Sequence, residues 1–163
     1  MSMQKHTTVV IGVGNPDRGD DAVGPLVASS LKKHAGEKFT VIEQAGEGLA
    51  LMEIWEGADA VIILDAALSG GPAGAIHRID ATTESVPKDC FRCSTHALGV
   101  AEAIELARAL GQLPRRVIVY GIEGESFEAG AGLSAAVESA ALELEALVLQ
   151  EIETAEHAVA LGD

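Results

Sequence analysis

Short runs of β-branched residues alternate with longer amphipathic segments along almost the whole chain. This alternation is typical of an α/β fold in which helices cover a mostly parallel sheet. The runs that we expect to form strands are 8–13, 39–43, 60–64, 74–79 and 116–122. In the fourth run apolar and polar residues alternate, which predicts a less buried strand at an edge, where antiparallel pairing is one option. The pattern thus predicts a three-layer α/β/α fold around a twisted, mostly parallel five-stranded sheet.

The segments between the strands repeat apolar residues every three or four positions, as amphipathic helices do. We expect helices over residues 21–34, 48–55 and 98–110, and a long final helix with an apolar stripe that begins at Leu133. The glutamates of that final helix fall mostly away from the stripe, which predicts a solvated face. Residues 80–95 form a long loop without any period, and loops of that length are often functional. A second loop, 123–132, is rich in glycine and glutamate.

The length of 163 residues is that of one ordinary domain, so we expect a single domain over residues 1–163. A hydrophobic fraction of 48% excludes a disordered chain. Because aromatic residues make up only 3%, the core must consist mainly of valine, isoleucine, leucine and alanine.

The charge balance narrows the choice of partners. The chain carries 11 lysines and arginines against 25 aspartates and glutamates, which gives a net charge of −14. Such a chain repels phosphate groups, so we expect neither nucleic acid nor a membrane as partner. No apolar run is long enough to span a bilayer, and residues 1–6 lack the apolar core of a signal peptide, so we expect a cytoplasmic protein.

Polar residues near the ends of predicted strands are the first candidates for a site, because ligands of open α/β sheets bind beyond the carboxyl ends of the strands. The loop 14–21, Asp65 and Glu123 meet this condition. The loop has aspartate at position 17, where a dinucleotide-binding fingerprint requires a third glycine, so a small nucleotide-binding domain is the least favoured alternative. Purely structural roles remain open, with Asp20 capping the following helix and Asp21 complementing its dipole.

Asp21, Asp65 and His96 together offer two carboxylates and an imidazole. Such a set of oxygen and nitrogen donors binds divalent ions such as Ni²⁺ or Zn²⁺ and leaves coordination positions open. A helix-start histidine is also often just a structural residue. The sequence contains neither the GxSxG motif of serine hydrolases nor the HExxH motif of zinc metalloproteases. Neither of these two enzyme classes is therefore an alternative to this interpretation.

The three candidate residues lie in three motifs, which follow one another along the chain as GVGNPDRGDDAVGP, ILDAAL and STHALG. In this combination the chain resembles the hydrogenase maturation endopeptidases, which process the large subunits of [NiFe] hydrogenases. The resemblance implies a metal-dependent, aspartic-type endopeptidase in which Asp21, Asp65 and His96 contact nickel already held by the large-subunit precursor, with zinc as another ion that would suit the donors. It also implies removal of a short C-terminal peptide from that precursor. The position of Asp21 is often glutamate in this family.

Two alternatives stay open from the sequence. Cys90 and Cys93 lie close to His96, so the three could form most of a structural zinc site, or the cysteines could be a redox pair or ordinary thiols. A non-catalytic assembly factor that recognises nickel without cutting the precursor would use the same three site residues.

Overall fold

The computed structural model describes residues 7–45, 48–87, 91 and 99–160, with side chains up to residue 156. The strands are β1 (Thr8–Val13), β2 (Thr40–Gln44), β3 (Ala60–Ala67), β4 (Ile76–Asp80) and β5 (Arg116–Glu123). The helices are α1 (Val23–Ala35), α2 (Gly48–Trp55), α3 (Val100–Ala109) and α4 (Ala135–Ala160), and a short 3-10 helix, η1 (Gly19–Ala22), precedes α1. The strands form one sheet in the order β2-β1-β3-β5-β4. All neighbours are parallel except β4, which pairs antiparallel with β5 at the edge. The predicted α/β class with a mostly parallel five-stranded sheet is confirmed.

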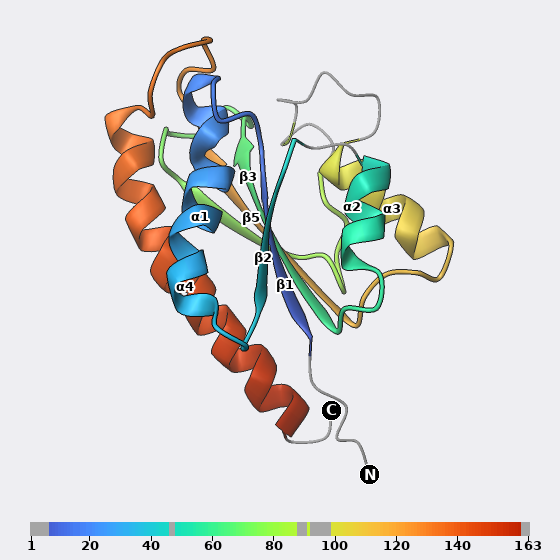
Figure 1. Cartoon of the computed structure of the whole chain (residues 1–163). Coiled ribbons are helices and arrows are strands. Elements are labelled where there is room, and N and C mark those ends of the chain that lie inside the picture. Colours follow the sequence, from blue (N-terminus) through green and yellow to red (C-terminus); the bar gives the residue numbers. More distant parts are fainter. Residues whose placement is uncertain (1–6, 46–47, 88–90, 92–98, 161–163) are drawn as a thin grey trace.

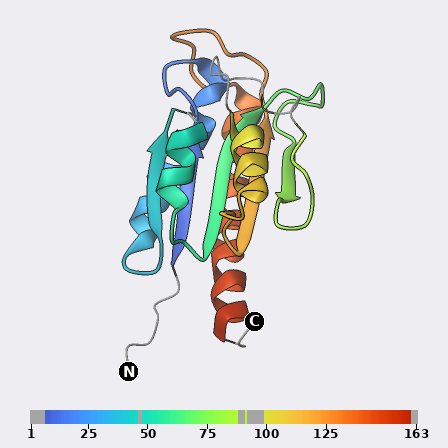
Figure 2. The same cartoon turned by 90° about the vertical axis from the view of Figure 1, so that its right-hand side faces the viewer.

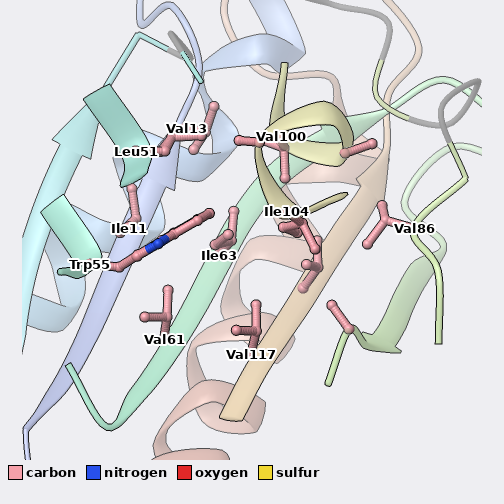
Figure 3. Packing of buried hydrophobic residues seen from close by; sticks show 14 of the residues in the cluster. Ile11, Val13, Leu51, Trp55, Val61, Ile63, Val86, Val100, Ile104 and Val117 are labelled. Atoms are coloured by element: carbon pink, nitrogen blue, oxygen red, sulfur yellow. The ribbon is translucent and has the colours of Figure 1, made fainter. Parts of the chain in front are cut away.

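Helices cover both faces of the sheet. Figures 1 and 2 show α1 and α4 together on one face, and α2 and α3 on the other. Each face has its own hydrophobic cluster, because the strands carry apolar side chains on both sides. Figure 3 shows Trp55 of α2 and Ile104 of α3 pointing toward strand residues such as Ile63. None of the helices in the described part of the chain combines the length and hydropathy needed to cross a membrane.

Several elements begin or end at other residues than the pattern predicts. The third and fifth strands continue to Ala67 and Glu123, because β3 and β5 stay paired through that position. Asp65 consequently lies inside β3, opposite Gly121, and does not follow the strand as predicted. The first long helix begins at Val23 and not at residue 21, because the preceding residues form η1.

The prediction of a solvated glutamate face on the last helix is wrong for Glu151. This side chain is only 6% exposed. Its carboxylate accepts hydrogen bonds from Arg78 of β4 at 2.7 Å and from Arg116 and Tyr120 of β5 at 2.7 and 2.8 Å. The contacts neutralise the buried charge and connect α4 to the two strands below it.

Helix α1 lies unusually close to the sheet at its first turn. A Cβ atom on Gly24 would collide with the carbonyl oxygens of Val13 and Leu64, and one on Gly12 would collide with Gly24 and Ala28. Only glycine allows this approach. The first turn of α1 therefore packs against the end of β1 and the middle of β3, and η1 precedes this turn directly.

Candidate active site

Asp21 lies in η1 and is 7% exposed. Its Oδ2 accepts a hydrogen bond from the backbone N–H of Asn15 at 2.9 Å, and its own N–H donates to the carbonyl of Arg18 at 3.1 Å. Gly14 has a φ of 143° and a Cβ there would collide with the Asp21 carbonyl, so glycine is required for this turn. Burial raises the pKa of Asp21, although the Asn15 hydrogen bond and the nearby Arg18 oppose the rise.

Asp65 lies in the second half of β3 and is 6% exposed. Burial raises the pKa of Asp65 well above its ordinary value, and the negative charge of Asp21 raises it further. The backbone N–H of Ala66 opposes this effect. The structure thus brings Asp21 and Asp65 close enough to interact electrostatically. Two buried carboxylates that repel each other favour the uptake of a proton or a cation.

Asp20, the neighbour of Asp21, has the opposite environment. It is fully buried, and its carboxylate accepts backbone hydrogen bonds from Glu125, Ser126 and Ser134 at 2.7, 3.1 and 2.7 Å. Burial alone would raise the pKa of Asp20, but these bonds outweigh it and the pKa lies below its usual value. The capping role considered for Asp20 is wrong, because α1 begins after Ala22 without a side-chain cap.

Glu123, the third position considered from the sequence, ends β5 and is 1% exposed. It accepts hydrogen bonds from the backbone N–H groups of Ser69 and Gly71 at 2.6 and 3.0 Å and from the Ser69 hydroxyl at 3.0 Å. His77 Nε2 lies 3.3 Å from its Oε2. Burial raises the pKa of Glu123, yet the hydrogen bonds led by Ser69 bring it below the usual value. Glu123 therefore anchors the loop that follows β3.

The third predicted site residue, His96, lies outside the described residues, as do Cys90 and Cys93. Within the described ranges, no group of three histidine, cysteine, aspartate or glutamate side chains is arranged to hold a metal ion. Asp21 and Asp65 supply two oxygen donors of the predicted set, and the nitrogen donor stays a prediction. Sequence reasoning missed Ser69, Ser134 and His77, whose roles depend on partners far away in the chain.

A comparison with known protein families identifies the chain. The family model for hydrogenase maturation proteases matches residues 25–151. The chain belongs to the hydrogenase maturation protease family. The match includes Asp65 and begins just after the turn that carries Asp21.

The sequence is also similar to individual proteins of this family. The chain is 28% identical to the hydrogenase 2 maturation protease of Escherichia coli K12 over 133 residues, which are 80% of this chain and 81% of that protein. It is 25% identical to the hydrogenase expression/formation protein HupD of Thiocapsa roseopersicina over 71% of this chain. That alignment spans 53% of HupD, about half of its length.

Solved structures of the family share the fold. The hydrogenase maturating endopeptidase HybD from E. coli superposes with a TM-score of 0.75 at 24% identity, covering 91% of this chain and 93% of that one. The [NiFe] hydrogenase maturation protease HycI from Thermococcus kodakarensis gives a TM-score of 0.67 at 25% identity, with 92% and 94% covered. The α/β architecture is therefore that of the hydrogenase maturation proteases.

Proposed function

We propose that the protein is an endopeptidase that removes the C-terminal peptide from the nickel-loaded precursor of a [NiFe] hydrogenase large subunit in the cytoplasm. The observation that carries this proposal is the pair of buried, mutually repelling carboxylates, Asp21 and Asp65, at the carboxyl edge of the sheet in a chain of this family. Such an edge is where open α/β sheets bind their ligands.

The electrostatics of the pair support contact with a cation. Burial and the charge of Asp21 both disfavour the ionised form of Asp65 in the free protein. A divalent ion carried by the substrate would reverse this preference, because it attracts both carboxylates. With His96 as a third donor, the set of oxygen and nitrogen ligands suits nickel, and zinc as well. Nickel here belongs to the precursor and is not a resident cofactor.

The same pair can serve the hydrolysis of a peptide bond. A metal ion beside the scissile bond polarises its carbonyl group and makes water a better nucleophile. A carboxylate beside that water can accept its proton as a general base. Asp21 and Asp65 are both candidates for this base. This chemistry needs no serine or cysteine nucleophile. A protease that uses it depends on a metal ion and on aspartate side chains, so we propose a metal-dependent, aspartic-type endopeptidase.

The proposal is tested by incubating the purified protein with a nickel-loaded large-subunit precursor and measuring the intact mass of the precursor. We expect the loss of one C-terminal peptide with the wild type and no loss with Asp21→Asn, Asp65→Asn or His96→Ala. Asp17→Asn is the matched control, since Asp17 lies in the same loop and its side chain is exposed. Tight binding without any mass change would favour the non-catalytic assembly factor, and full activity of the three site variants would exclude these residues from the mechanism.

A further inference from the structure

Asp20 is a buried charged side chain that the proposed chemistry does not use. Its Oδ2 accepts hydrogen bonds from the N–H groups of Glu125 and Ser126 and from the Ser134 hydroxyl at 2.9 Å. Its Oδ1 accepts the N–H of Ser134 and, at 3.1 Å, the same hydroxyl. These donors occupy both oxygens, so the carboxylate has little capacity left for a metal ion or a water molecule.

All of these donors belong to one segment, residues 124–134, which connects β5 to α4. Figures 1 and 2 show this segment beside the loop that follows β1, at the carboxyl edge of the sheet. The backbones of the two loops are also bonded to each other, in both directions. Asp20 N–H donates to Ser126 at 2.8 Å, Gly19 N–H to Ala131 at 3.1 Å, and Gly130 N–H to Asp17 at 2.8 Å. Asp20 lies at the centre of this contact.

Asp21 itself is held by different contacts. Its carboxylate is bonded to Asn15 and its N–H to Arg18, and both of these residues belong to its own loop. Weakening the side-chain bonds of Asp20 should therefore loosen the segment 124–134 without removing the restraints on Asp21. The two neighbouring aspartates thus have separable roles.

We propose that Asp20 is a positioning residue that fixes the segment 124–134 against the turn carrying Asp21, so that this segment forms a rigid wall for the C-terminal peptide of the substrate. This inference rests on the proposed function and adds to it the residue that builds the peptide-binding wall. Because the segment is already ordered, it loses less conformational entropy when the peptide binds, and so Asp20 acts on substrate affinity more than on the chemical step.

Asp20→Asn tests the proposal. The side chain of asparagine has one oxygen and one NH₂ group in place of the two carboxylate oxygens. The NH₂ group would face backbone N–H donors and cannot accept their hydrogen bonds, so at least one of the three backbone bonds is lost. With the nickel-loaded precursor as substrate, we expect KM to rise about tenfold while kcat changes by less than about threefold. Endoproteinase Glu-C, which cuts after glutamate, should cleave the variant after Glu125 or Glu128 faster than the wild type, and mass spectrometry identifies these cuts.

Asp17→Asn is the control, because it removes an exposed acid from the same loop and keeps the backbone bond to Gly130. Ser134→Ala is a milder variant in case Asp20→Asn does not fold. It removes only the hydroxyl, whose single hydrogen is shared between the two Asp20 oxygens, and we expect a smaller rise in KM with the same unchanged kcat.

The outcomes separate this inference from the proposed function. A wild type that does not cut the precursor overturns the proposed function and this inference with it. An active wild type whose Asp20 and Ser134 variants keep their KM and their resistance to Glu-C overturns the inference alone. A fall in kcat at constant KM would also contradict it, because Asp20 would then act on the reacting groups.

Discussion

At the scale of single residues, two adjacent aspartates of the same sequence motif have opposite environments. Asp20 is saturated with hydrogen bonds and its pKa is lowered, whereas the pKa of Asp21 is raised by burial. The sequence alone did not separate them, since each could cap or flank a helix, and only the resemblance to the family selected Asp21. The distinction depends on Ser134, which lies 114 positions from Asp20 and has no local signal.

Replacing Asp65 should affect activity and stability differently. Its ionised form is disfavoured by burial and by Asp21, so replacement by a neutral amide of the same shape relieves that repulsion. We expect Asp65→Asn to have an unchanged or higher Tm in thermal unfolding followed by circular dichroism. Processing of the nickel-loaded precursor should fall by about a hundredfold or more, as when an electrostatic catalytic group is removed.

A lower Tm together with retained processing would show that Asp65 is a structural residue. Asp17→Asn is again the control, since the exposed Asp17 should affect neither measurement.

At the scale of elements, the contact between α1 and the sheet determines where Asp21 lies. Gly24→Ala places a methyl group against the carbonyl oxygens of Val13 and Leu64, so α1 must move outward. We expect the free energy of unfolding to fall by about 1–3 kcal/mol in urea denaturation, because overpacking of a tight contact is destabilising. Processing should fall as well, since η1 precedes α1 directly.

Gly132→Ala is the matched control, because a Cβ at Gly132 meets open space. It should change the free energy of unfolding by less than about 0.5 kcal/mol. Equal stability of the two variants would show that α1 does not depend on this close approach.

The attachment of α4 gives a prediction about pH. Burial raises the pKa of Glu151, but hydrogen bonds from Arg78, Tyr120 and Arg116 lower it to about 2, below the usual glutamate value of 4.5. Ionised Glu151 therefore stabilises the fold above about pH 4.5, and this contribution is lost as the pH falls toward 2. Burial and the bond to Glu151 also raise the pKa of Tyr120 to about 12.

We expect Glu151→Gln to lower the free energy of unfolding by about 2 kcal/mol at pH 7, which is typical for hydrogen bonds to a charged group. The difference from the wild type should be smaller at pH 3.5. Urea denaturation at both pH values measures it, with Glu153→Gln as an exposed control on the same helix. A difference that stays constant or grows on acidification would contradict the assigned role of Glu151.

At the scale of the whole molecule, hydrophobic periodicity was enough to predict the order of the five strands and the four α-helices, but not the short 3-10 helix η1. It could not predict where β3 ends, because Ala66 and Ala67 carry little strand preference and their place depends on pairing with β5. The pattern placed Asp21, Asp65 and Glu123 near strand ends, where parallel strands share one edge. It could not show that Glu123 is an anchor, because its partners Ser69 and His77 lie 54 and 46 positions away.

We propose that Asp21 and Asp65 contact nickel carried by the substrate during cleavage. The most direct test compares the intact mass of nickel-loaded and nickel-free large-subunit precursor, each incubated with the wild-type protein under otherwise equal conditions. We predict that only the nickel-loaded precursor loses its C-terminal peptide. Equal cleavage of both precursors, or cleavage of neither, would contradict the account.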